Sequence, residues 1–207
     1  MNAKIKILVA DDHAVVRSGL ALLLATERDF EVVGQAKNGE EAVTLARKSK
    51  PDVVVMDLAM PKMDGAEATK RILEERPSTR VVILTSFGAA DGVAHALQAG
   101  ATGALMKTAE DETLVATIRR VAAGERVISS DIRRELTANP PVPALTPRQR
   151  DILPSMTRGL TNKDIASELG IRRDGVDKHV NALLAKIGAA NRTEAVAIAL
   201  KKQLLKI

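Results

Sequence analysis

The stretch Pro51-Asp52-Val53-Val54-Val55-Met56-Asp57-Leu58-Ala59-Met60-Pro61 decides how the first half of the chain folds. Its run of β-branched residues predicts a strand that is buried on both faces, as the strands of a parallel sheet are. The strand ends in the carboxylate of Asp57, and Pro61 and Gly65 mark the turn beyond it. In open α/β sheets, ligands bind at the carboxyl edge of the strands, so Asp57 is the first candidate for a functional residue.

Apolar segments on either side of this stretch also have the length and composition of strands. With the central one, they predict five strands at residues 5–10, 31–36, 52–57, 81–85 and 103–106. The segments between them show the apolar spacing of helices, which implies right-handed βαβ crossovers and a sheet covered on both faces. The sequence therefore predicts an α/β fold with a doubly wound, five-stranded parallel sheet over residues 1–125.

Polar side chains stand at the carboxyl ends of four of these strands: Asp11 and Asp12, Asp57, Thr85 and Ser86, and Lys107. Carboxylates gathered at one edge repel each other unless a cation is present, and hard oxygen ligands without His or Cys select Mg²⁺. A carboxylate beside Mg²⁺, with a lysine opposite, can act as a nucleophile toward a phosphoryl group. Taken singly, the same residues have ordinary roles, since Asp12 and Ser86 can cap helices and Lys107 can lie on the surface.

In these features residues 1–125 resemble the receiver domain of two-component response regulators, which has a flavodoxin-like fold. The resemblance implies that Asp57 is the phospho-acceptor. It also implies that Asp11, Asp12 and Asp57 bind Mg²⁺ together with the backbone carbonyl of Ala59.

Further roles around the phospho-acceptor follow from the same resemblance. Lys107 would pair with the phosphoryl oxygens, the Thr85 hydroxyl would move to hydrogen-bond the phosphorylated form, and the small Ser86 would leave access to the aspartate. Receivers usually carry Tyr or Phe at the position of Ala104, and that aromatic normally moves with the threonine. Because this chain lacks it, we expect any switch to rely on Thr85 and on repacking near Phe87.

Charge is unevenly distributed along the chain. Residues 1–125 hold 16 Lys+Arg against 18 Asp+Glu, and residues 126–207 hold 15 against 8, so the net charges are −2 and +7. A basic second half favours a polyanionic partner, although a merely solvated basic surface gives the same count.

The chain has no cysteine, no signal-peptide pattern and no segment that could span a bilayer. We therefore expect a cytoplasmic protein without a membrane partner.

Residues 126–144 are expected to form a linker. A short helix opens it, and the run Ala138-Asn139-Pro140-Pro141-Val142-Pro143 follows as an extended spacer. Beyond it, helix-start signals at Thr146 and Thr161 and a break at Gly170 predict short helices joined by tight turns. Such helices suit a helix-turn-helix that enters the major groove of DNA, whereas a four-helix bundle for dimerisation is the alternative. The positive charge favours DNA, so we predict a small all-α helix-turn-helix domain over residues 145–207.

This domain resembles the LuxR-type helix-turn-helix module over residues 145–200. The segments that match are Leu145-Thr146-Pro147-Arg148, Gly159-Leu160-Thr161-Asn162-Lys163-Asp164-Ile165-Ala166 and Asn191-Arg192-Thr193-Glu194-Ala195. A receiver followed by this module is similar to response regulators of the NarL/FixJ type. The resemblance implies a transcription regulator that a sensor histidine kinase phosphorylates, that binds double-stranded DNA and that forms a homodimer when active.

The candidate DNA contacts lie mostly on the third helix of the domain. If its valines face the core, Lys178 points toward the groove to reach phosphate or guanine, and Asn181 can read adenine. Asp177 would also face the DNA and repel it, at a position where the resembling family usually has Lys. The other candidates are Lys163, Arg172 and Arg173. Pro154 falls inside the first helix, where it removes a backbone hydrogen bond at a cost of about 3 kcal/mol.

Other functions are compatible with parts of this pattern. The nearest alternative is a regulator of the same fold that works without phosphorylation or binds DNA poorly. An aspartyl-nucleophile phosphatase usually needs a second Asp two residues after the first, and Ala59 occupies that position, so we expect no enzyme. A quorum-type sensor would share the LuxR module but would not bring three carboxylates to one sheet edge.

Overall fold

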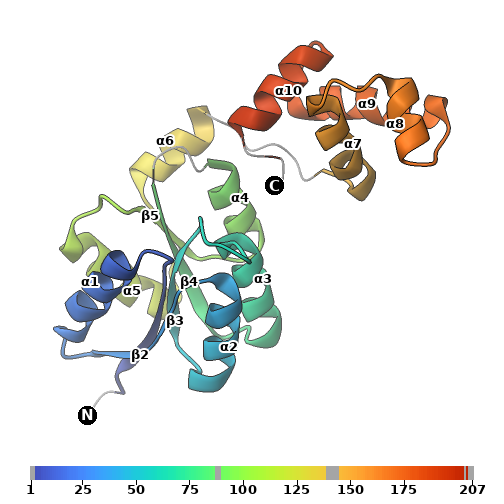
Figure 1. Cartoon of the computed structure of the whole chain (residues 1–207). Helices are drawn as coiled ribbons and strands as arrows, with labels where there is room; N and C mark the ends of the chain where they lie inside the picture. Colours follow the sequence, from blue (N-terminus) through green and yellow to red (C-terminus); the bar gives the residue numbers. More distant parts are fainter. Residues whose placement is uncertain (1–2, 87–89, 139–144, 203, 205–207) are drawn as a thin grey trace. The chain divides into compact units, whose positions relative to one another are not determined.

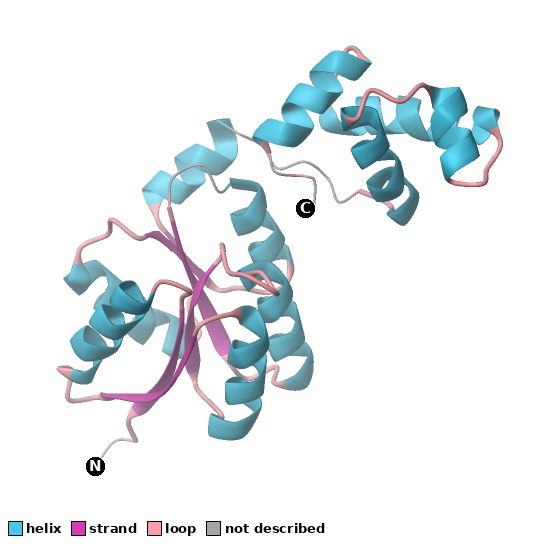
Figure 2. Cartoon of the chain, in the orientation of Figure 1, coloured by secondary structure: helices cyan, strands magenta, loops and turns pink. Residues whose placement is uncertain are grey.

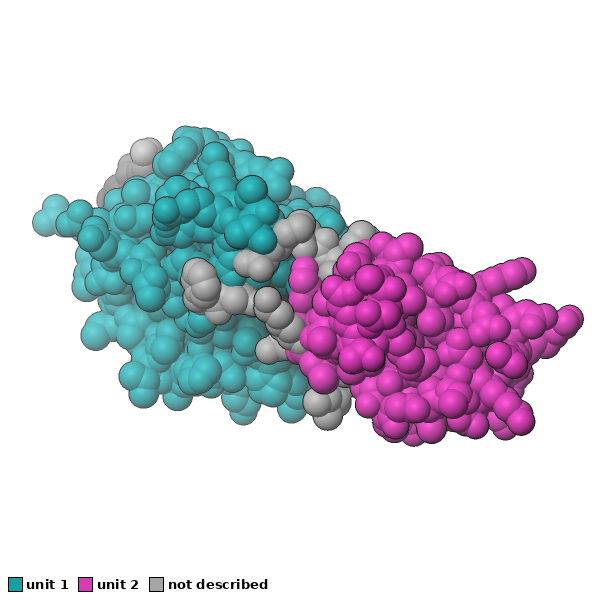
Figure 3. Space-filling view, turned by 90° about the horizontal axis from the view of Figure 1, so that it is seen from above, with its two compact units in different colours: residues 1–141 teal, residues 142–207 magenta. Residues whose placement is uncertain are grey.

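The computed structural model describes residues 3–86, 90–138, 145–202 and 204 of the 207-residue chain. Phe87 and the proline-rich spacer therefore lie outside the described residues. The chain divides into two compact units, residues 1–141 and residues 142–207, which Figure 3 colours separately. Each unit has its own hydrophobic core. Within the described ranges, none of the helices combines the length and the apolar character needed to cross a membrane.

Unit 1 is built on a parallel sheet of six strands in the order β2-β1-β3-β4-β5-β6 (Figures 1 and 2). The strands are β1 (Ile5–Ala10), β2 (Phe30–Ala36), β3 (Val53–Asp57), β4 (Arg80–Thr85), β5 (Gly103–Met106) and β6 (Val127–Ile128). β3 lies between β1 and β4, and every one of its residues is buried. The predicted central strand is confirmed, and its position brings Asp57 to the middle of the carboxyl edge.

Helices cover both faces of this sheet (Figure 2). They are α1 (Ala14–Ala25), α2 (Gly39–Ser49), α3 (Gly65–Glu75), α4 (Ala90–Gln98) and α5 (Asp111–Ala122). Val53 and Val55 share a core with α1 and α5, whereas Val54 and Met56 share the other core with α2, α3 and α4. Successive strand residues point to opposite faces, so one continuous apolar run fills two cores. The predicted doubly wound arrangement is confirmed.

The sheet continues beyond residue 125, the predicted end of the first domain. Val127 N donates to Thr102 O at 2.8 Å and Ser129 N donates to Ala104 O at 3.0 Å, so β6 pairs with β5. The next helix, α6 (Ser130–Ala138), buries Ile132 in the core of α2, α3 and α4. Residues 126–138 thus belong to unit 1 rather than to a linker, and the sheet has six strands instead of five. β6 was not predicted because a strand of two residues is too short to show an alternating pattern of apolar and polar residues.

Unit 2 is all-helical, as predicted. Its helices are α7 (Pro147–Thr157), α8 (Asn162–Glu168), α9 (Arg173–Ile187) and α10 (Arg192–Lys201). The side chains of Thr146 and Thr161 each accept a hydrogen bond from a first-turn N–H and complete a capping box. Between α8 and α9, Gly170 has a φ of 62°, in the left-handed region that favours glycine. The short helix, tight turn and longer helix form the expected helix-turn-helix.

Pro154 lies in the interior of α7 with an exposed side chain. A proline there cannot donate to the carbonyl of Arg150 and costs about 3 kcal/mol. We therefore expect Pro154→Ala to raise the free energy of unfolding of unit 2 by up to about 3 kcal/mol, measured by hydrogen exchange of amides in α9. Pro147→Ala is the matched control, because a proline in the first turn has no helical hydrogen bond to lose. An equal gain in both variants would contradict this explanation.

Candidate functional site

Asp57 ends β3 at the centre of the sheet edge and is only 4% exposed. Its Oδ1 accepts a hydrogen bond from the N–H of Leu58 at 2.8 Å, and its Oδ2 lies 3.0 Å from Lys107 Nζ. Burial raises the pKa of Asp57 above its ordinary value, and the charge of Asp11 adds to this, while Lys107 and the Leu58 N–H act in the opposite direction. The carboxylate is held at one oxygen and paired with a cation at the other, which suits a positioned nucleophile.

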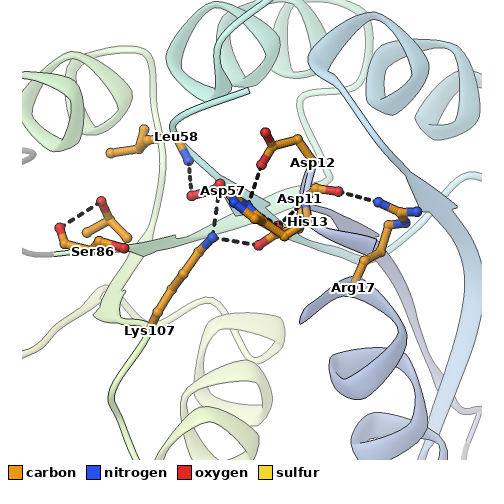
Figure 4. Close-up of polar contacts among 9 residues, drawn as sticks. Asp11, Asp12, His13, Arg17, Asp57, Leu58, Ser86 and Lys107 are labelled. Atoms are coloured by element: carbon orange, nitrogen blue, oxygen red, sulfur yellow. Dashed lines mark hydrogen bonds and ion pairs between the residues drawn. The ribbon is translucent and has the colours of Figure 1, made fainter. Parts of the chain in front are cut away.

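Lys107 follows β5 and bridges two carboxylates that come from two other strands (Figure 4). Its Nζ lies 2.7 Å from Asp11 Oδ2 and 3.0 Å from Asp57 Oδ2. Burial alone would lower the pKa of Lys107, but the hydrogen bonds and charges of Asp11 and Asp57 outweigh it and raise that pKa. The ends of β1, β3 and β5 thus bring together three groups that are far apart in the sequence.

The loop after β1 completes the acidic pocket. Asp11 is 1% exposed, and its Oδ1 accepts a hydrogen bond from His13 N at 2.8 Å. Asp12 Oδ1 is buried, and no hydrogen bond reaches it among the described residues. The ligand atoms of Asp11, Asp12, His13 and Asp57 all lie within 4.8 Å of one another. Clustered carboxylates with an unsatisfied buried oxygen fit a divalent cation. The pattern of the sequence predicted only oxygen donors here and did not indicate the nitrogen of His13.

The remaining candidates in unit 1 have different surroundings. Thr85 is buried at the end of β4, and its hydroxyl donates to the carbonyl of Ser86 at 3.3 Å. Ser86 directly follows β4, Ala59 lies two residues beyond β3, and both are exposed. Ala104 is fully buried in β5, where it pairs in register with Ile83 and joins the hydrophobic core. Ala104 therefore packs in the hydrophobic core of unit 1.

The turn that follows Asp57 leaves no space for a side chain at Gly65. The N–H of Gly65 donates to the carbonyl of Leu58 at 3.0 Å, and an added Cβ would lie 2.1 Å from the carbonyl oxygen of Asp57. Asp64 caps α3 immediately before it by accepting from the N–H of Glu67. The helix thus begins against the backbone of the candidate nucleophile and fixes its position. The sequence marked Gly65 only as part of a turn.

In unit 2, the exposed surface of α9 carries the predicted DNA contacts. Lys178 and Asn181 are exposed, while Val176 and Val180 are buried in the core, as the apolar spacing predicted. The other basic candidates, Lys163 on α8 and Arg172 and Arg173 at the start of α9, are exposed as well.

Asp177 differs from its neighbours because it is bound within unit 2. Its Oδ1 accepts from Asn162 Nδ2 at 2.7 Å, and Asn162 Oδ1 in turn accepts from Arg192 Nη1 at 3.0 Å. Its Oδ2 lies 3.8 Å from Arg173 Nε. The half-buried carboxylate therefore joins the first turns of α8, α9 and α10. That Asp177 faces DNA and repels its phosphates stays a prediction, and within unit 2 the carboxylate already contacts Asn162 and Arg173.

Residues 7–119 match the family of response regulator receiver domains, and residues 143–199 match the luxR family of bacterial regulatory proteins. This chain is a two-component response regulator. The order of the two domains places it in the NarL/FixJ family, whose members are transcription regulators with a DNA-binding domain rather than enzymes. The fold and the function predicted from the sequence are thereby confirmed.

Relatives of this response regulator extend over nearly its whole length. It is 42% identical over 208 residues to the uncharacterized transcriptional regulatory protein YhcZ of Bacillus subtilis (strain 168), covering 96% of this chain and 97% of the relative. It is 37% identical over 214 residues to the oxygen regulatory protein NreC of Staphylococcus haemolyticus (strain JCSC1435), covering 97% and 99%. Among solved structures, the response regulator ChrA of a heme-sensing two-component system is 31% identical, with a TM-score of 0.59 and coverage of 98% and 100%.

Proposed function

We propose that Asp57 of this response regulator accepts a phosphoryl group from a sensor histidine kinase and that this transfer controls DNA binding by unit 2. The observation that carries the proposal is the bridge made by Lys107, whose Nζ lies 3.0 Å from Asp57 Oδ2 and 2.7 Å from Asp11 Oδ2. In the transfer, one oxygen of Asp57 forms a bond to phosphorus while the bond between phosphorus and its donor breaks. Lys107 is close enough to neutralise the phosphoryl oxygens that arrive beside Asp57.

The donor set of the pocket fits Mg²⁺. Asp11, Asp12 and Asp57 supply hard carboxylate oxygens, and we place the backbone carbonyl of Ala59 with them. The buried Asp12 Oδ1, which has no hydrogen-bond partner among the described residues, supports this assignment. When bound, the ion offsets the charge of the carboxylates and of the phosphoryl group.

Thr85 is the residue at which we expect the response to phosphorylation to begin. Its hydroxyl now donates to the carbonyl of Ser86 at 3.3 Å, a long hydrogen bond that is readily exchanged for a phosphoryl oxygen. The exposed Ser86 leaves the approach to Asp57 open to a donor. Because Ala104 is a small core residue, no aromatic at that position accompanies the movement.

Unit 2 supplies the output. We assign contacts with double-stranded DNA in the cytoplasm to Lys178 and Asn181 on α9 and to the basic residues Lys163, Arg172 and Arg173. The half-buried Asp177 instead supports the start of α9 through Asn162. A phosphorylated homodimer would present two copies of α9 to paired half-sites.

A gel-shift series with promoter DNA, Mg²⁺ and a small phosphodonor tests the proposal. The phosphodonor should strengthen binding by the native protein only, and an equal gain in Asp57→Asn would contradict it.

Lys178→Ala should weaken binding to specific and random duplexes alike. If Lys178 contacts one phosphate, its loss should make the slope of log K against log salt shallower by about 0.9. Fluorescence anisotropy of labelled duplexes across a salt series measures this slope. Arg148→Ala on α7 removes another basic side chain of unit 2 and should leave the slope unchanged. A loss confined to the specific duplex would show that Lys178 reads a base instead.

A further inference from the structure

The imidazole of His13 lies at the carboxylate pocket of unit 1 (Figure 4). Its Nδ1 is 2.8 Å from Asp12 Oδ1 and 3.5 Å from Asp11 Oδ1. His13 follows Asp12 directly in the chain, so the ring and the two carboxylates belong to one short loop between β1 and α1. The proposed Mg²⁺ site uses only oxygen donors, and this nitrogen has no part in it.

The surroundings of His13 show that its ring is available as a ligand. It is the N-cap residue of α1, but its side chain makes no capping hydrogen bond, and its backbone N–H donates to Asp11 Oδ1. The side chain is 69% exposed, so its packing does not account for its position. Although Nδ1 lies 2.8 Å from Asp12 Oδ1, that buried oxygen has no hydrogen bond among the described residues. Among the described residues, the ring nitrogen thus faces the carboxylates of the pocket and makes no capping contact with α1.

The spacing of the donors fits a shared cation. Adjacent ligands of an octahedral ion that are each about 2.1 Å from the metal lie about 3 Å apart. The two distances from Nδ1, 2.8 Å and 3.5 Å, lie on either side of this value. Imidazole is a ligand that late first-row transition metals prefer, whereas Mg²⁺ prefers oxygen and keeps several waters.

We propose that His13 is a nitrogen ligand that lets this pocket take a divalent first-row transition-metal ion more tightly than a pocket with oxygen donors alone. The inference rests on the proposed function, because Asp11, Asp12 and Asp57 supply the carboxylate ligands in both cases. It concerns which cation loads the receiver, and the regulator would respond to the supply of such ions as well as to its kinase.

Metal titrations of the full-length protein test the proposal. Calorimetry with Co²⁺ and with Mg²⁺, at a single pH, should show that His13→Ala lowers the affinity for Co²⁺ at least tenfold. This scale follows because even outer-shell partners of metal ligands typically contribute about 10- to 100-fold in affinity. The affinity for Mg²⁺ should remain unchanged, since Mg²⁺ prefers oxygen ligands and keeps several waters. Pulsed electron paramagnetic resonance of bound Mn²⁺ should show a nitrogen coupling that His13→Ala abolishes.

The chain offers matched controls, because its other histidines are His95 and His179. Alanine at either position should preserve the nitrogen coupling and the affinity for Co²⁺. Absence of the coupling in the native protein would overturn the inference. So would tighter binding of both ions by His13→Ala, since the ring would then only occupy the place of the cation. Asp12→Asn separates the two proposals: if Mg²⁺ binding survives this change, the proposed Mg²⁺ site itself is wrong.

Discussion

Asp57→Asn should abolish phosphorylation of this response regulator. The amide oxygen is a far weaker nucleophile than the carboxylate. Among the described residues, no second carboxylate combines contacts with Leu58 N and Lys107 Nζ as Asp57 does. With a small phosphodonor and Mg²⁺, intact-mass spectrometry should show one hydroxylamine-labile phosphoryl group on the native protein and none on the variant. The expected effect is complete loss, the largest that we predict.

Asp111→Asn is the matched control for this experiment. Asp111 is an exposed aspartate in the first turn of α5, and its replacement should leave labelling unchanged. If Asp57→Asn were labelled as fully as the native protein, the acceptor would be another residue. Asp11 and Asp12 would then be the first to test, since they are the other carboxylates in the pocket.

Gly65→Ala should both destabilise unit 1 and slow phosphorylation. The new methyl group would lie 2.1 Å from the carbonyl oxygen of Asp57, and its other near atoms are also backbone atoms, which cannot move aside as a flexible side chain does. Such overpacking typically costs 1–3 kcal/mol, and a backbone clash should reach about 3 kcal/mol. Because the clash pushes on the residue that carries the nucleophile, the rate of phosphoryl uptake should fall as well. Chemical denaturation and intact-mass time courses measure the two effects.

Gly19→Ala makes the same chemical change as Gly65→Ala, but we expect it to stabilise unit 1 rather than destabilise it. Gly19 is exposed in α1, and an added Cβ would meet nothing within 4 Å. Alanine in the interior of a helix should therefore stabilise unit 1 by about 0.5–1 kcal/mol and leave phosphorylation unchanged. A similar loss in the two variants would mean that glycine flexibility, rather than the close approach at Gly65, is what unit 1 requires.

The strand ends were predictable because parallel sheets obey simple rules. Once residues 53–57 were identified as a strand of a parallel sheet, the other strands of that sheet had to bring Asp11 and Lys107 to the same edge as Asp57. The capping boxes at Thr146 and Thr161 were equally accessible, since each depends on residues only three positions apart. Local spacing and sheet topology thus account for the pocket and for the starts of the helices in unit 2.

Contacts between distant residues were not predictable in the same way. Asn162, Asp177 and Arg192 come from three helices, and no spacing rule joins them. Helical periodicity alone places Asp177 on the surface of α9 predicted to face DNA, and it does not predict the contact with Asn162. The ring of His13 was not predicted for a different reason. His13 directly follows Asp12 in the sequence, but only the structure shows that its Nδ1 lies beside the Asp12 carboxylate.

The pairing of β6 with β5 determines where the receiver can be cut from the rest of the chain. A fragment that ends at residue 125 would turn β5 into an edge strand with unpaired N–H and C=O groups, and it would uncover the core around Ile132. Such an edge is a template for pairing with other chains, so this fragment should aggregate. A fragment that ends after Ala138 keeps β6 and α6 and should stay monodisperse in light scattering. The match to the receiver family ends at residue 119. A fragment cut at residue 125 would nevertheless lack part of the fold of unit 1.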